Sequence, residues 1–129
     1  MKTLLIIPFL FICSLVIGQT YNSDSIIGKP IRIGNLEVAQ FDFPKEMTWY
    51  DAKKACTDLG NGWRLPTKDE LNLVYINKDK IGGFANFGCW SSTEFSNDFA
   101  WGQYFIGFGN QVGSNKVSNA SVRAVRTIN

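Results

Sequence analysis

The first regular pattern along the chain is an alternation of hydrophobic and polar residues that begins at residue 31. Ile31–Ile33 and Leu36–Val38 alternate in this way on either side of Gly34-Asn35, and a glycine-led pair of residues favours a two-residue turn. The two segments therefore predict a β-hairpin. The alternation continues through residues 40–43 and stops at the proline that follows.

Two helical patterns come next. Hydrophobic residues recur at spacings of three and four over residues 49–59, directly after Thr48, a residue type that caps helix N-termini. Gly60 is a natural C-terminal stop for this helix. Residues 67–70 read Thr-Lys-Asp-Glu, a capping box, and a second hydrophobic stripe follows it. The sequence therefore predicts helices over residues 49–59 and 68–77.

Strand and turn patterns occupy the rest of the chain. We expect strands over residues 89–93, 100–106, 111–117 and 121–126. The order of strands, two helices and then strands predicts an α+β fold. In this fold two helices pack on a small, mostly antiparallel sheet, and the two ends of the chain come together.

The N-terminus has the pattern of a cleavable signal peptide. One basic residue, Lys2, precedes an apolar run of 14 residues over positions 4–17, which is too short for a bilayer core of about 30 Å. Val16 and Gly18 are the small residues that a signal peptidase requires before its cleavage point. Residues 1–18 are therefore expected to be removed, leaving Gln19 as the new N-terminus.

Cleavage divides the chain into a leader and one domain. Cys13 is not expected to carry a lipid, because the bulky Ile12 precedes it and the apolar run continues beyond it. Residues 19–29 are polar and predict a loose lead-in, and residues 30–129 predict one domain. The protein is therefore expected to be secreted or periplasmic, with no membrane anchor after cleavage.

The composition of the mature chain excludes several classes of function. Its 12 basic and 11 acidic residues are nearly balanced, which disfavours binding to nucleic acid. The sequence contains no histidine, which removes Ser-His-Asp catalysis, Cys-His catalysis and histidine-based zinc sites. No pattern indicates a cofactor or a metal.

Two cysteines remain after cleavage, Cys56 and Cys89. An even number of cysteines in an oxidising compartment is consistent with a disulfide. Two buried free thiols are the alternative, since cysteine packs well as a small apolar residue. The sequence leaves both alternatives open.

Five motifs in a fixed order resemble a known family over about 95 residues: MTWYDAKKAC, GWRLPTKDEL, CWSSTE, AWGQYF and VRAVR. They are similar to the family named for the C-terminal domain of the Legionella collagen-like protein and to the related Fibrobacter major paralogous domain. The resemblance implies a C-type-lectin-like fold, which is shared with formylglycine-generating enzymes. It also implies a bacterial exported protein and, in the namesake, binding to sulfated glycosaminoglycans.

The chain departs from the patterns of its relatives at several positions. Family members often have tyrosine where this chain has Cys89, and some have a cysteine where it has Ala124. The bridge from first helix to last strand that such a cysteine implies is therefore absent here. The triplets through which C-type lectins bind calcium and sugar are missing as well, and no catalytic cysteine pair of the formylglycine-generating type is present. The resemblance therefore carries over the fold and export alone.

Several large or charged residues are expected to be structural. Arg64 is expected to pair with Glu70 or Glu94, with ligand capture of a sulfate or carboxylate as the alternative. Arg123 and Arg126 lie three apart, so they point to opposite faces of a strand, and at least one is expected to meet a carboxylate. The tryptophans expected in structural positions are Trp63, Trp90 and Trp101.

The carboxylates near residue 94 do not form a recognisable catalytic or metal site. Glu94 and Asp98 are the candidate pair for a carboxylate-dependent polysaccharide hydrolase, but no feature raises the pKa of either group. With Asp79 they are also the candidate calcium ligands, but no loop pattern supports six oxygen ligands. We expect neither activity.

Residues 95–118 combine more aromatic side chains than one core face requires with many amides. Surfaces of this composition suit sugars and proteins as ligands. Trp101 and Phe105 share one strand parity and are expected to face the core. The expected ligand-binding residues lie on the other side and at the turn: Tyr104, Phe108, Asn110 and Gln111.

The sequence therefore predicts an exported bacterial binding module that is not an enzyme and that recognises a glycan or a cell-surface protein. A structural or assembly domain without a small ligand is the first alternative. A polysaccharide hydrolase that uses only carboxylates is the second.

Overall fold

The computed structural model describes residues 21–85 and 87–129. The predicted signal peptide and its cleavage site lie outside these residues. The helices are α2 (Ser23–Ile27), α3 (Trp49–Asp58), α4 (Lys68–Ile76) and α5 (Lys78–Ile81). The strands are β1 (Ile31–Ile33), β2 (Leu36–Val38), β3 (Gly88–Glu94), β4 (Phe99–Tyr104), β5 (Gln111–Asn115) and β6 (Val125–Thr127).

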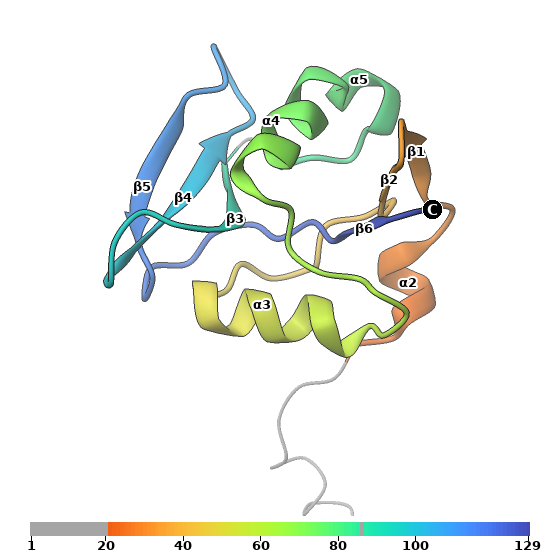
Figure 1. The fold of residues 1–129 in the computed structure, drawn as a ribbon, viewed down its shortest axis with the longest axis horizontal. Coiled ribbons are helices and arrows are strands. Elements are labelled where there is room, and N and C mark those ends of the chain that lie inside the picture. Colours follow the sequence, from red (N-terminus) through yellow and green to blue (C-terminus); the bar gives the residue numbers. More distant parts are fainter. Residues whose placement is uncertain (1–20, 86) are drawn as a thin grey trace, which may run out of the picture.

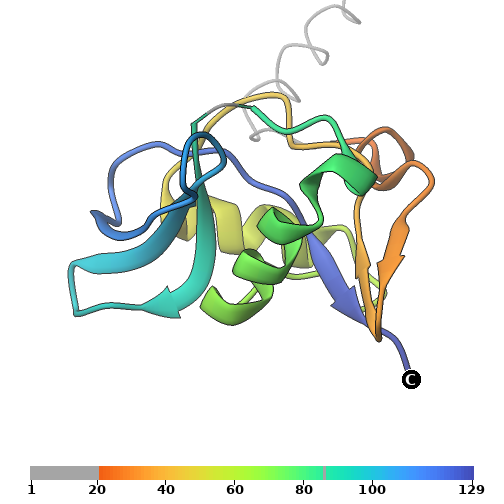
Figure 2. The same ribbon diagram turned by 90° about the horizontal axis from the view of Figure 1, so that it is seen from above.

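The strands form two antiparallel three-stranded sheets, in the orders β1-β2-β6 and β3-β4-β5. The small single sheet expected from the sequence is therefore divided in two. The sheets lie at opposite ends of the molecule, with α3 and α4 between them (Figures 1 and 2). Because β6 pairs with β2, the last strand of the chain adjoins the first hairpin, as the strand order predicted.

The two long helices begin where their caps place them. The Thr48 hydroxyl accepts a hydrogen bond from the backbone N–H of Asp51, and α3 then buries a stripe that includes Trp49 and Cys56. At α4, Thr67 and Glu70 make both hydrogen bonds of a capping box. These caps satisfy N–H groups that the first turn of a helix leaves without partners.

Two short helices were not predicted. The lead-in over residues 19–29 is not uniformly loose, because α2 forms inside it, capped by the side chain of Asn22. Ile26 of this helix is buried, and the Ile27 carbonyl accepts a hydrogen bond from the backbone N–H of Gln40. Helices α2 and α5 have five and four residues, too few for hydrophobic periodicity to reveal them.

The segment that leads into β6 crosses the centre of the molecule (Figure 1). It makes isolated backbone bridges through Ala120 to Met47, through Ser121 to Cys89 and through Val125 to Arg64. Residues 121–125 are all buried. This segment therefore links the loop before α3, the start of β3 and the loop before α4 into one unit.

The hydrophobic core has two parts. The larger cluster surrounds α3 and contains Trp49, Trp63 and Trp90. The second lies beside α4 and contains Leu71, Val74 and Phe105 among others. Burial of this apolar surface is the main stabilising contribution to such a domain.

Candidate functional site

The β3-β4-β5 sheet has one covered face and one open face. Successive residues of β4 point to opposite sides. Gln103 is buried, and its amide donates a hydrogen bond to the Asn72 side chain on α4 at 2.9 Å. Tyr104 points the other way and keeps 45% of its surface exposed. Helix α4 therefore covers one face. On the other face, Trp90 and Ala100 join the core cluster around α3, and the part near Tyr104 stays open.

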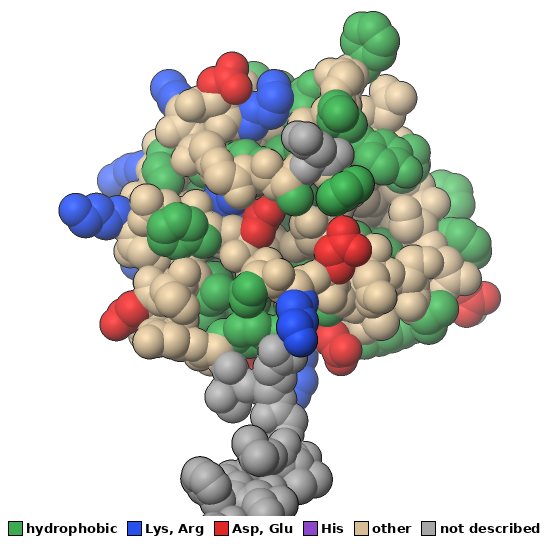
Figure 3. Space-filling view, turned by 180° about the vertical axis from the view of Figure 1, so that it is seen from behind, with side chains coloured by type: hydrophobic (Ala, Val, Ile, Leu, Met, Phe, Trp, Pro, Cys, Tyr) green, Lys and Arg blue, Asp and Glu red, His purple; other side chains and the backbone are tan. Residues whose placement is uncertain are grey.

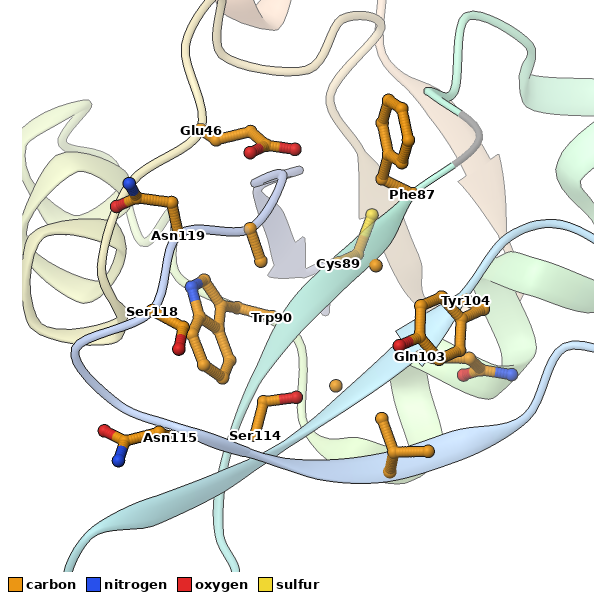
Figure 4. Close-up of a pocket in the computed structure, with 14 residues that line it drawn as sticks. Glu46, Phe87, Cys89, Trp90, Gln103, Tyr104, Ser114, Asn115, Ser118 and Asn119 are labelled. Atoms are coloured by element: carbon orange, nitrogen blue, oxygen red, sulfur yellow. The ribbon is translucent and has the colours of Figure 1, made fainter.

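A hollow of about 450 Å³ lies on the open face (Figure 4). Gly88 pairs with Tyr104 and Trp90 pairs with Gly102 across the strands, so two glycines contribute to its floor. Trp90 is fully buried there, and its indole N–H donates to the Met47 carbonyl at 2.9 Å. Protein sites for small ligands commonly have volumes of about 300–1,000 Å³.

The walls of the hollow combine aromatic rings with neutral polar groups. Phe87 and Tyr104 are exposed to 64% and 45%, respectively. Hydroxyl and amide side chains line the opposite wall: Ser114, Asn115, Ser118 and Asn119. Glu46 supplies the charge at the rim, and none of the described residues that line the hollow is basic. This surface has rings for stacking and several donors and acceptors for hydrogen bonds.

A second, wider hollow of about 570 Å³ adjoins the first and shares Glu46 and Phe87 with it. It also contains Asp42 and Phe84. The space-filling view from behind shows acidic side chains near the centre of that face with a basic side chain beside them, and other basic side chains toward its edge (Figure 3). The residues that line the two hollows are themselves acidic or neutral.

The structure separates the four residues that the sequence grouped as a ligand surface. Tyr104 lines the hollow. Phe108 and Asn110 lie at the turn between β4 and β5, where Phe108 is 97% exposed. Gln111 pairs with Gln103 across the strands and therefore shares its covered face. Its amide donates to the Lys68 carbonyl at 2.8 Å and to the Gln103 side chain. The four residues do not form one surface.

The sequence contains no pattern that marks Glu46 or Phe87 as residues of the hollow. Both lie outside the regular elements, Glu46 just before α3 and Phe87 just before β3. Loop residues have no periodicity from which their direction can be inferred. Asn115 and Ser118, in contrast, belong to the amide-rich segment that the sequence selected.

Arg64 is engaged within the protein. Its guanidinium forms two hydrogen bonds to the Glu70 carboxylate, at 2.7 and 3.0 Å, and a third to the Thr127 hydroxyl at 2.7 Å. The hydrogen bonds from Arg64 hold the pKa of Glu70 below its ordinary range and raise the pKa of Arg64 itself. Of the two expected carboxylates, Glu70 is the partner.

Arg123 and Arg126 both meet carboxylates. Arg123 is 1% exposed and donates to Asp42 at 2.7 Å and to three backbone carbonyls. Burial raises the pKa of Asp42, although Arg123 and the backbone N–H of Ala85 favour its ionised form. Arg126 donates to Glu37 at 2.7 Å, and its guanidinium lies over the Trp63 ring.

Lys116 and Glu94 form a structural pair at the end of the sheet. The Lys116 ammonium is buried and donates to Glu94 at 2.8 Å and to the Asn97 carbonyl at 2.7 Å. The pKa of Glu94 is lowered by this hydrogen bond, the opposite of what a general acid needs. Among the described residues, no group of three or more acidic or cysteine side chains is placed to hold a metal ion.

Three further expectations concern Trp101, Phe105 and the cysteines. Phe105 is buried, whereas Trp101 is partly exposed on the α4 side, where the Lys68 ammonium lies 3.8 Å from its ring centre. Cys56 and Cys89 are free, buried thiols in the two different core clusters. Burial raises the pKa of both thiols. The structure therefore has the free-thiol alternative rather than the disulfide.

The arrangement of two small sheets around two helices is a C-type-lectin-like fold. Botrocetin has the same fold, with a TM-score of 0.57 at 12% sequence identity over 79% of this chain and 98% of botrocetin. Botrocetin in complex with the A1 domain of von Willebrand factor gives a TM-score of 0.54 at 13% identity, covering 78% of this chain and 97% of that one.

The chain belongs to the Lcl C-terminal domain family, whose model matches residues 29–126. This confirms the family that the sequence motifs indicated. No curated protein matches the sequence. Within residues 21–85 and 87–129, no helix is long and apolar enough to cross a membrane.

Proposed function

We propose that this domain is a non-catalytic binding module whose open sheet face takes a segment of a glycan. The observation that carries the proposal is the hollow itself, in which the rings of Phe87 and Tyr104 stand opposite hydroxyl and amide side chains (Figure 4). Sugars present apolar CH faces and a rim of hydroxyl groups. An aromatic ring beside amides is complementary to both.

A protein ligand is the second candidate, and one observation favours it. Botrocetin, which has this fold, is found in complex with the A1 domain of von Willebrand factor. Exposed aromatic side chains such as Phe87 and Phe108 are typical anchors of protein interfaces. A pull-down with surface proteins, using the variants described below, separates this candidate from glycan binding.

The chemistry of the described residues gives no support to catalysis. Glu94, a member of the candidate hydrolase pair, is tied to Lys116 and keeps a low pKa. The two thiols are buried with raised pKa values, which makes them poor nucleophiles. A function in binding requires only the hollow and a rigid scaffold around it.

Binding of neutral oligosaccharides on a glycan array, followed by titration calorimetry, tests the proposal. We expect Tyr104→Ala to weaken binding by about fivefold to thirtyfold, the effect of losing an aromatic contact of about 1–2 kcal/mol. Phe108→Ala is the matched control, since it removes a more exposed ring outside the hollow. If Phe108→Ala weakens binding and Tyr104→Ala does not, the site lies at the turn and the hollow is not the binding site.

We also propose that the protein is exported, to the periplasm or the exterior of a bacterium. The support is the signal-peptide pattern over residues 1–18, together with the export that the resemblance to the family implies. Intact-mass measurement of protein recovered outside the cytoplasm tests this proposal. A chain that begins at Gln19 supports it, and a chain that retains Met1 and stays in the cytoplasm contradicts it. A lipid on Cys13 would contradict the expected cleavage site but not export.

A further inference from the structure

Glu46 has an unusual position among the acidic residues. It lines both hollows, at the place where they meet. Its carboxylate lies at the rim of the first hollow and points toward Phe87 (Figure 4). Glu37, Glu70 and Glu94 each form an ion pair, whereas Glu46 forms none with any residue that the structure describes.

The basic residues near Glu46 do not line the hollows. Lys45, next to Glu46 in the chain, is exposed but belongs to neither lining. None of the described residues that line either hollow is Lys or Arg. Arg123 is 1% exposed and is occupied by Asp42 and backbone carbonyls. Lys116, the only basic residue within 95–118, is 4% exposed and is bound to Glu94. The groove that the two hollows form together is therefore lined by acidic and neutral side chains.

A carboxylate beside an exposed aromatic ring is a favourable site for a cation. An ammonium group gains a charge-assisted hydrogen bond from the carboxylate and attraction from the face of the ring. Phe87 offers that ring, since 64% of its surface is exposed at the shared rim. A sulfate group in the same place would meet a negative charge and no basic partner.

We propose that Glu46 and Phe87 form a cation subsite, and that the ligand of this groove is an oligosaccharide with a free amino group. The inference rests on the proposed glycan function and adds a charge requirement to it. The amino group lies at Glu46, and the neutral part of the sugar chain continues toward Tyr104 and the amide wall. Sulfated glycans are excluded from this groove.

Three tetrasaccharides of different charge test the proposal by titration calorimetry on the full chain. They are a glucosamine tetramer, its fully N-acetylated form and a heparin tetrasaccharide. At about pH 5.5 the amines are protonated and carboxylates are ionised. We expect the glucosamine tetramer to bind at least about tenfold more tightly than the acetylated tetramer, which is about 1.4 kcal/mol. The heparin tetrasaccharide is expected not to bind.

Glu46→Gln is the decisive variant. We expect it to abolish the preference for the free amine, so that the two tetramers bind the variant with similar affinity. Asp58→Asn is the matched control, since it removes the same charge at the far end of α3, where Asp58 pairs with Lys54. It should retain the preference. Raising the salt concentration should weaken the binding of the glucosamine tetramer and leave the binding of the acetylated tetramer unchanged.

The outcomes separate the inference from the proposed function. If both neutral and cationic tetramers bind equally, and Tyr104→Ala weakens both, the groove binds glycans and the cation subsite is wrong. If Glu46→Gln leaves the preference intact, the subsite is also wrong. If none of the three tetrasaccharides binds, the cation subsite is wrong, and the glycan function is overturned as well if the array also shows no ligand. If the heparin tetrasaccharide alone binds, the domain binds a glycan and the cation subsite is wrong.

Discussion

Replacing Glu70 by Gln tests whether Arg64 holds the fold together or is available to a ligand. In the structure, Glu70 accepts two hydrogen bonds from Arg64 and one from the backbone N–H of Thr67. Glutamine has the same length and still accepts a hydrogen bond from Thr67, so the capping box survives. The substitution therefore removes the charge of the pair and one of its two hydrogen bonds, because an amide nitrogen cannot accept a hydrogen bond from Arg64.

The expected loss follows from the partial exposure of the pair. The side chains of Arg64 and Glu70 are 37% and 26% exposed, so water screens much of their attraction. Exposed ion pairs contribute about 0.2–1 kcal/mol to stability. The bidentate contact between Arg64 and Glu70 places this pair at or slightly above the upper end of that range. We expect a loss of about 1 kcal/mol at pH 7, which lowers the melting temperature by about 4–6 °C.

The pH dependence gives a sharper criterion. Because the hydrogen bonds from Arg64 lower the pKa of Glu70, the unfolded chain takes up this proton at a higher pH than the folded one. The stabilisation is then complete above the unfolded pKa and is lost as the pH falls through the folded pKa. Glu70→Gln should be less stable than the natural protein at pH 7, and the difference should disappear once the pH has fallen below the folded pKa of Glu70.

Urea denaturation followed by tryptophan fluorescence measures both values, since Trp63 and Trp90 are buried. Asp58→Asn serves as the control, because its pair with Lys54 is 60–75% exposed and is expected to contribute nothing measurable. Equal stability of Glu70→Gln and the natural protein at pH 7 would refute a structural role for the pair. A deficit that persists at low pH would show that the lost charge is not its cause.

Two further predictions concern buried thiols and a turn. Cys56 and Cys89 should resist alkylation in the native protein, because burial raises the pKa of each thiol. Both should react in denaturant without reductant. Mass spectrometry measures the extent of alkylation, and a cysteine that stays unmodified in denaturant contradicts the prediction. Gly109→Ala should destabilise the protein by well over 1 kcal/mol, because Gly109 has φ +68° and its added methyl group would overlap the Tyr75 ring. Gly107→Ala, at φ +67° with open space around it, should cost distinctly less in the same denaturation assay, and equal losses would show that the ring contact is not the cause.

The sequence by itself determined the elements whose signals are local. Caps at Thr48 and Thr67 and the hydrophobic stripes behind them placed α3 and α4 to within a residue at either end. The alternation around Gly34 placed the first hairpin, because side-chain direction in a strand has a period of two. The family followed from motifs that are themselves consecutive in the chain.

The sequence was less informative about how the strands combine. Four strand segments after residue 88 were expected, but their division into two sheets depends on which strand pairs with which. Pairing joins residues far apart in the chain, such as Val38 with Val125 in the sheet that closes the ends. No local pattern encodes that choice, because each strand offers the same backbone hydrogen-bonding groups to any neighbour.

The candidate site was decided by the tertiary structure. The composition of residues 95–118 and the alternation along β4 selected Tyr104, which lines the hollow. Gln111 was grouped with Tyr104, but the register of β4 with β5 sets Gln111 on the covered face. Glu46 and Phe87 reach the hollow from loops on either side of the buried segment that leads into β6. A loop residue takes its direction from the elements that hold the loop at both ends. The charge and shape of this groove therefore arise only once the distant parts of the chain have packed together.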